Sequence, residues 1–202
     1  MDTEVALTET QGLILHLSPI LKKMNNHEFF KFCRLNPDLR IELTSEGDLI
    51  IMPPTGGQTG KINFTLTGFF SAWVERDGSG IGFDSSTGFI LPNGAKRSPD
   101  LAWVERSRWE TLTEEEQKEF PPLCPDFIVE IRSPSDSIKT LKAKMKEYLA
   151  NGARLGWLID PLEKQVYIYL PSAKVRPLKN PKTISGEPVL PGFILDLGRL
   201  WS

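Results

Sequence analysis

Two apolar segments that each carry one carboxylate constrain the fold of this chain more than any other feature. Residues 98–104 contain Asp100, and residues 126–132 contain Glu130 inside the run FIVEI. The second run is almost continuously apolar, which is typical of a strand buried on both faces of a sheet. An ionised carboxylate in such a strand is costly unless it is compensated, and hard divalent cations bind carboxylate oxygens. The two segments therefore predict neighbouring strands that hold a metal ion.

Each carboxylate also has a structural explanation, which the residues alone leave open. Asp100 follows Ser98 and Pro99, and this order of residues starts many turns. Glu130 could form a salt bridge with an arginine in the core. In either case the side chain would stabilise the fold and would have no role in chemistry.

A second acid, Asp126, competes with Asp100 as the partner of Glu130. Asp126 and Glu130 share one predicted strand and lie four residues apart, so their Cα atoms are separated by roughly 13 Å. Metal–oxygen bonds of about 2.0–2.6 Å cannot join carboxylates at that separation. Asp100 and Glu130 can converge from adjacent strands, and Asp126 is expected to open its strand.

Segments with helical spacing alternate with strand-like runs along the chain. Helices are predicted from about Gly60 to Arg76 and from roughly Ser137 to Asn151. Further strands are expected around residues 80–83, 87–91, 155–159 and 165–170. This order indicates an α/β or α+β architecture in which helices flank a central sheet.

The N-terminal part is expected to add smaller elements to this core. Residues 1–24 are predicted to form a loosely structured arm, and residues 25–202 a single domain. A short helix is expected after Asn25, followed by a hairpin of residues 40–43 and 49–52 with Gly47 in its turn. One acidic helix is predicted from Trp109 to about Phe120.

Composition limits the classes of protein to which the chain can belong. The 202 residues carry a formal charge of −2, which argues against a surface coated with basic residues but leaves room for a local basic groove. Cys33 and Cys124 form no CxxC pair, and His16 and His27 are the only histidines, so a zinc site is not expected. We find no signal peptide and no stretch of about 18 apolar residues, and we expect a cytoplasmic protein without a membrane span.

Two basic residues could complete a site around the acids. Arg132 lies two residues after Glu130, which places both side chains on one face of the strand, where a guanidinium could bind phosphate. On the predicted helix, at about 100° per residue, Lys144 falls at the edge of the apolar stripe, whereas Lys139 and Lys142 lie on the solvent side. Lys144 could reach the sheet, or it could be a lysine at the rim that extends to solvent.

The glycine-rich sequence GGQTGK of residues 56–61 does not fit a phosphate-binding loop. Thr55 stands where the first glycine belongs, and Ile62 stands where a serine or threonine must hold magnesium. We expect a turn and the start of a helix, at the border of the active cleft.

With these residues in place, the sequence resembles the PD-(D/E)XK nuclease superfamily and, more closely, the Uma-two family of restriction endonucleases. The likeness spans roughly residues 25 to 200 and is most specific between Asp126 and Pro161. It is carried by the segments MPPTGG (52–57), SPD (98–100), VEIRSPS (129–135), Lys144 with Tyr148, and NGARLGWLIDP (151–161).

The resemblance implies a restriction-endonuclease-like fold with an active site that uses Mg²⁺, or Mn²⁺ in its place. Asp100 would match the aspartate of the PD element and Glu130 the acid of the (D/E)XK element. Arg132 occupies the usual lysine position, and Lys144 matches a lysine that family members carry on the following helix. Glu42 matches a frequent family acid whose role stays open. Many relatives have Glu-His where this chain has Gln-Thr at residues 58 and 59.

We therefore expect a metal-dependent DNA endonuclease in which Asp100 and Glu130 hold Mg²⁺, Lys144 orients a water, and Arg132 steadies the phosphate. The alternative is a binding module that keeps the nuclease fold without catalysis, because an arginine occupies the usual lysine position. Cleavage of both DNA strands would favour a homodimer.

Overall fold

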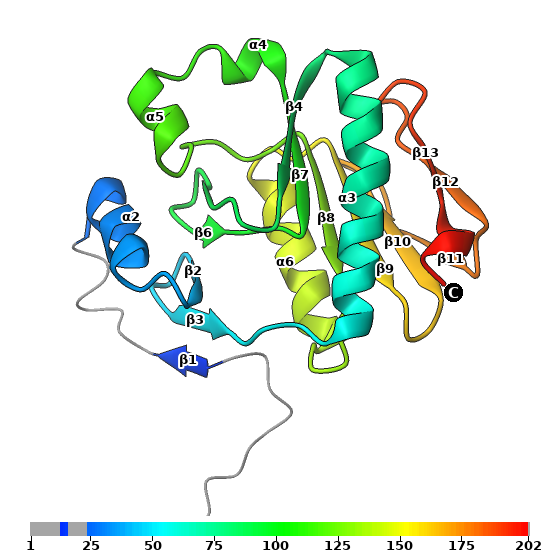
Figure 1. Cartoon of the computed structure of the whole chain (residues 1–202), viewed down its shortest axis with the longest axis horizontal. Coiled ribbons are helices and arrows are strands. Elements are labelled where there is room, and N and C mark those ends of the chain that lie inside the picture. Colours follow the sequence, from blue (N-terminus) through cyan, green and yellow to red (C-terminus); the bar gives the residue numbers. More distant parts are fainter. Residues whose placement is uncertain (1–12, 16–23, 202) are drawn as a thin grey trace, which may run out of the picture.

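A six-stranded mixed sheet forms the centre of the molecule (Figure 1). The computed structural model describes residues 13–15 and 24–201. The strands of this sheet are β4 (Gly80–Asp84), β7 (Leu101–Glu105), β8 (Phe127–Ile131), β9 (Leu155–Asp160), β10 (Gln165–Tyr169) and β11 (Arg176–Lys179). Their order is β11-β10-β9-β8-β7-β4, and only β8 and β9 pair in parallel. A parallel pair needs a crossover, which α6 (Ile138–Ala150) provides.

Two helices cover the opposite faces of this sheet, α3 (Gly57–Asp77) in front and α6 behind in Figure 1. Alternate residues of β8 join different cores, as the two-residue period of a strand requires. Phe127, Val129 and Ile131 pack with the buried residues of α3. Ile128 packs with Leu141, Met145 and Tyr148 of α6. The same period places Glu130 on the α6 side.

The predicted N-terminal helix and hairpin are both present. They are α2 (Asn26–Leu35), β2 (Arg40–Leu43) and β3 (Leu49–Met52), and Gly47 has a φ of 97° in the turn. Asn25 and Glu28 form a capping box at the start of α2.

The hairpin belongs to a second sheet with the order β1-β3-β2-β6-β5, in which β1 is Leu13–Leu15, β5 is Phe89–Ile90 and β6 is Lys96–Arg97. The rest of the expected arm, apart from Met24, lies outside the described residues, and the domain boundary at residue 24 stays a prediction.

The prediction of one continuous helix from Trp109 to Phe120 is wrong. The chain forms two short helices, α4 (Arg106–Trp109) and α5 (Glu114–Lys118). The Thr113 side chain accepts a hydrogen bond from the Glu116 amide, and the Glu116 side chain bonds back to the Thr113 amide. This capping box starts a new helix at residue 114 and thereby separates it from α4.

The C-terminal segment covers the α3 side of the sheet. It consists of β12 (Thr183–Ser185), β13 (Ile194–Asp196) and the 3₁₀ helix η1 (Leu197–Arg199). The Phe193 ring stacks on Trp157 of β9 at a centroid distance of 5.8 Å. With this layer in place, the predicted α+β fold with a central mixed sheet flanked by helices is confirmed.

Candidate active site

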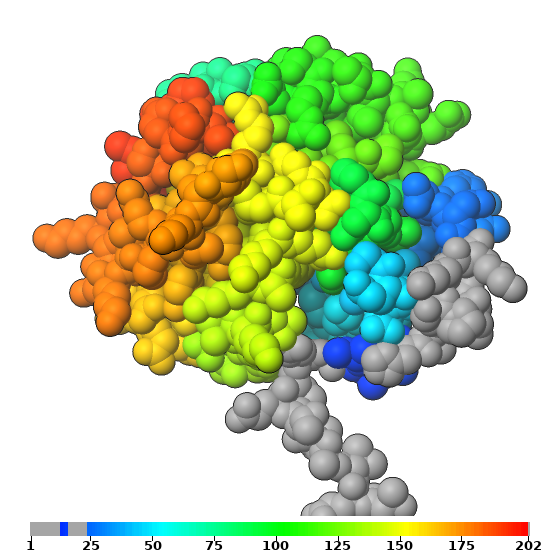
Figure 2. Space-filling model, turned by 180° about the vertical axis from the view of Figure 1, so that it is seen from behind, coloured from blue at the N-terminus to red at the C-terminus, as the bar shows by residue number. Residues whose placement is uncertain are grey.

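A cleft of about 660 Å³ lies between the N-terminal hairpin and the carboxylate-bearing ends of β7 and β8. In Figure 2 it lies between α6, in yellow-green, and the cyan hairpin. Its walls are largely apolar and include Ile50, Met52, Pro53, Pro54, Pro134 and Leu141. The charged side chains that line it include Glu42, Asp100, Glu130 and Lys144. Three of the four residues predicted for the site therefore share one cleft.

Asp100 and Glu130 come together because β7 and β8 are antiparallel neighbours. Leu101 pairs with Val129, so Asp100 lies beside Glu130 at the adjoining position of the ladder. Asp100 Oδ2 accepts a hydrogen bond of 2.8 Å from the amide of Ile131. The sheet itself thus fixes the aspartate against the strand that carries the glutamate.

Lys144 reaches these acids from α6 and does not extend to solvent. Its Nζ lies 2.8 Å from Glu130 Oε1 and 2.8 Å from Glu42 Oε1. One turn further along the helix, the Tyr148 hydroxyl donates a 3.0 Å hydrogen bond to the same Glu130 oxygen. Residues four apart on a helix share a face, so both donors point at one carboxylate.

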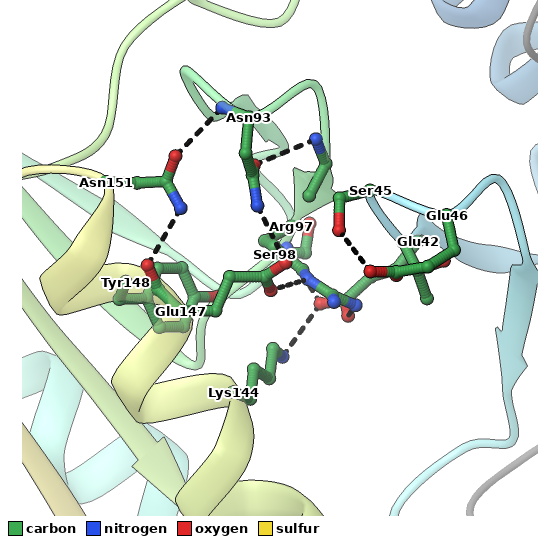
Figure 3. A network of polar contacts seen from close by, with 12 residues as sticks. Glu42, Ser45, Glu46, Asn93, Arg97, Ser98, Lys144, Glu147, Tyr148 and Asn151 are labelled. Carbon is green, nitrogen blue, oxygen red and sulfur yellow. Dashed lines mark hydrogen bonds and ion pairs between the residues drawn. The ribbon is translucent and has the colours of Figure 1, made fainter.

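Glu42 links the hairpin to α6 through Lys144, and to Arg97 of β6, as Figure 3 shows. Its Oε1 also accepts from the Ser98 amide at 2.8 Å, and its Oε2 lies 3.2 Å from Arg97. Arg97 Nε in turn lies 2.7 Å from Glu147 of α6. A buried acid within the strand Ile41-Glu42-Leu43 was the signal in the sequence, but its partners come from distant segments.

Burial and charge act in opposite directions on these groups. Burial opposes ionisation of Glu42, but Lys144 and Arg97 outweigh it and lower the pKa of this carboxyl. Burial raises the pKa of Glu130 to about 7. The positive charge of Lys144 offsets only part of this rise, and the negative charges of Asp100 and Glu42 increase it.

The pKa of Asp100 is also raised, by burial that the Arg40 charge only partly offsets. Burial alone would lower the pKa of Lys144, but Glu130 and Glu42 raise it, so the ammonium stays charged. The cleft thus holds two acids that are costly to ionise, Asp100 and Glu130, beside the fixed positive charge of Lys144.

The expectation that Arg132 binds phosphate in the cleft is not supported by its position. Arg132 does not line the cleft. Its Nη1 lies 2.9 Å from Asp160 Oδ2, and its Nε donates to the Asp136 carbonyl at 3.3 Å. Asp160 is buried in the neighbouring strand β9, and its ion pair with Arg132 holds the guanidinium beside β9 rather than in the cleft.

Asp126 lies at the other end of β8, as the strand geometry predicts. It precedes the first residue of that strand, and its Oδ1 lies 2.8 Å from Arg108 and 3.6 Å from Arg154. The glycine-rich segment starts α3 at Gly57, and Thr55, Gly56 and Thr59 border the cleft. The expected turn and helix start at this segment are therefore present.

The donor set of Asp100 and Glu130 fits a hard divalent cation. Lys144 and Tyr148 both contact Glu130 at Oε1, and Arg40 Nη2 lies 3.6 Å from Asp100 Oδ1. Among the described residues, Glu130 Oε2 and Asp100 Oδ1 therefore have no hydrogen bond, and either oxygen could serve as a ligand.

Within the described residues no group of three or more His, Cys, Asp or Glu side chains is arranged to hold a metal. Two carboxylates suit Mg²⁺, which keeps several waters and takes phosphate oxygens as ligands.

Comparison with known proteins gives two findings. A family model, Uma2, described as "Putative restriction endonuclease", matches residues 27–198. The chain is also similar to a solved structure described as "a putative nuclease belonging to DUF820 from Anabaena variabilis", with 23% identity and a TM-score of 0.73. That match covers 88% of this chain and 97% of the other, and it shows a shared fold. Comparison with curated proteins returned no match.

Proposed function

This chain belongs to the Uma2 family of restriction endonucleases, and from that premise we propose that it is a Mg²⁺-dependent DNA endonuclease that hydrolyses phosphodiester bonds in the cleft. One observation carries the proposal. Asp100, just before β7, lies beside Glu130 of β8, and Lys144 of α6 lies 2.8 Å from Glu130. Two acids that can hold a metal ion and a lysine that can stabilise negative charge, together in one cleft, suit metal-assisted hydrolysis of a phosphodiester.

Each residue has a distinct role in this proposal. Asp100 and Glu130 would hold Mg²⁺, or Mn²⁺ in its place, which when bound supplies Lewis acidity and a water of lowered pKa. Lys144 is charged, so it cannot remove a proton from water. It would orient the attacking water by hydrogen bonding and stabilise the negative charge that develops on the phosphate. Its two carboxylate partners fix the position from which it does so.

The partners and the compartment follow from the same proposal. DNA is the substrate, and a homodimer would place one cleft at each strand. Among the described residues, no helix is both long and apolar enough to cross a membrane. Cys33 and Cys124 are free thiols, which supports a reducing compartment, the cytoplasm.

Cleavage of supercoiled plasmid with Mg²⁺ or Mn²⁺ tests this function. We expect wild-type protein to nick or cut the plasmid, and Asp100→Ala, Glu130→Ala and Lys144→Met to lose at least about a hundredfold in rate, as when a main electrostatic group is removed. Lys146→Met is the matched control, because Lys146 is exposed on the same helix and should leave the rate unchanged.

Metal binding separates the alternatives. Isothermal titration of wild-type protein with Mn²⁺ should show binding that Asp100→Ala and Glu130→Ala abolish. If the protein bound Mn²⁺ but cleaved neither duplex DNA, nor single-stranded DNA, nor RNA, the result would favour the non-catalytic binding module. If both variants lost stability while Mn²⁺ binding was unchanged, the two acids would be purely structural.

A further inference from the structure

The basic side chains that line the cleft are Arg40, Arg97 and Lys144, and they differ in how they are held. Arg97 forms ion pairs with Glu42 and Glu147, and Lys144 forms ion pairs with Glu42 and Glu130, all at 3.2 Å or less. Both positive charges are therefore already matched by carboxylates of the protein.

Arg40 is held more loosely. Its Nη2 donates a 3.0 Å hydrogen bond to the Ser98 carbonyl and lies 3.6 Å from Asp100 Oδ1. Its Nε is buried and has no hydrogen-bond partner among the residues that the structure describes. A buried donor without an acceptor is costly, so the described residues leave this guanidinium only partly satisfied. The side chain is 30% exposed, and Arg40 is one of the residues that line the cleft.

The strand that carries Arg40 aims it at the acids. Arg40 and Glu42 are two residues apart in β2, so both side chains leave the same face of the hairpin. Arg40 pairs with Met52 in β3, which is also part of the cleft wall. The guanidinium therefore lies between the apolar wall and Asp100.

We propose that Arg40 binds a phosphate of the substrate strand beside Asp100, the role that the sequence suggested for Arg132. A guanidinium carries its N–H donors in one plane, a planar fork that can match two phosphate oxygens, and it stays protonated at any relevant pH. The carboxylates that line the cleft outnumber its basic groups, so an incoming phosphate needs an extra positive contact. This proposal rests on the proposed function, because it takes nucleic acid as the ligand of the cleft.

Fluorescence anisotropy with a labelled DNA duplex in EDTA tests the contact without cleavage. We expect Arg40→Gln to weaken binding about tenfold, and to reduce the slope of log K against log salt by about 0.9, the value for one lost phosphate contact. Arg40→Lys keeps the charge and should keep the slope, but it should bind less tightly because an ammonium lacks the planar fork. A purely structural role for Arg40 would not separate the two variants in this way.

Arg176→Gln is the control variant, because Arg176 is exposed on β11 and should change neither affinity nor slope. Thermal melting of each variant checks that it folds. If Arg40→Gln does not fold, the affinity of Arg40→Lys still tests the contact. Unchanged affinity and slope in Arg40→Gln would overturn the proposal, and so would a wild-type protein that does not bind the duplex. Arg40-dependent binding by a protein that cleaves nothing with Mg²⁺ would instead overturn the proposed function and leave this contact standing.

Discussion

At the scale of single residues, Glu130 occupies the most demanding position in the cleft. Its carboxylate is buried against Asp100 and Glu42, and Lys144 supplies its closest positive charge. Removing one partner from a buried ion pair generally costs more than the pair contributes, because the remaining charge stays desolvated. The ionised form of Glu130 therefore places electrostatic strain on the folded protein, because burial and the two neighbouring carboxylates oppose its charge.

This strain predicts how stability depends on pH. Burial raises the pKa of Glu130 from about 4.5 to about 7 in the folded protein. Between these values the unfolded chain has released the proton and the folded chain still holds it, so stability falls as pH rises through this window. We expect Glu130→Gln to remove a fall on the order of 3 kcal/mol between pH 4.5 and 7.

Urea unfolding in EDTA at a series of pH values measures this effect. Glu114→Gln is the control, because the Glu114 side chain is 89% exposed and should leave the wild-type pH profile intact. A profile for Glu130→Gln that still falls as steeply as that of wild type would show that Glu130 ionises normally in the folded state.

The residues of the site were predictable to different degrees. Strand geometry was enough to bring Asp100 to Glu130, because both lie in runs that had to become neighbouring strands. Lys144 was predicted only as one of two alternatives, because the angle of a side chain on a helix does not show what lies opposite it. Arg132 was misplaced because the competing acid, Asp160, comes from another strand, and Arg40 drew no attention in the sequence.

At the scale of secondary structure, glycines occupy two very different environments. Gly68 lies within α3, and a Cβ at this position would meet nothing within 4 Å. Gly80 starts β4, where a Cβ would lie 2.3 Å from the Trp103 side chain and 2.4 Å from the Val104 carbonyl. The first position tolerates a side chain, and the second has no room for one.

The two positions form a matched pair for stability measurements. Gly68→Ala should raise the free energy of unfolding by about 0.5–1 kcal/mol, because alanine is the better helix former. Gly80→Ala should lower it by about 1–3 kcal/mol or more, because the indole and a backbone carbonyl must shift. Chemical denaturation of both variants provides the measurement. A Gly80→Ala protein as stable as wild type would mean that β4 can move away from β7 at little cost.

Local sequence signals were sufficient for the elements of the core. The periodicity of α6 and the apolar runs of β8 and β9 predicted these elements to within one or two residues. The prediction of one acidic helix from Trp109 to Phe120 was wrong because Thr113 caps a second helix inside that segment. The pairing of β2 with β6 could not be predicted, because a single ladder position, Leu43 with Lys96, joins strands more than fifty residues apart.

At the scale of the whole molecule, each chain contributes one pair of Asp100 and Glu130. The two strands of a DNA duplex run in opposite directions, so two copies related by a twofold axis would present equivalent clefts to both. A monomer would have to cut one strand, release the product and bind again. Whether nicked circles or linear plasmid form first therefore distinguishes a monomer from a dimer as the active species.

We expect nicked circles to dominate at low protein concentration and linear plasmid to appear more than proportionally as the concentration rises. Mixing wild-type protein with an excess of Glu130→Ala protein should convert linear product into nicked circles, because mixed dimers carry one active cleft. Agarose gels of supercoiled plasmid give the product ratio, and sedimentation equilibrium gives the mass over the same concentrations. Linear product that rises in simple proportion to a protein that stays monomeric would contradict the dimer, and it would leave the cleft of a single chain as the complete catalytic unit.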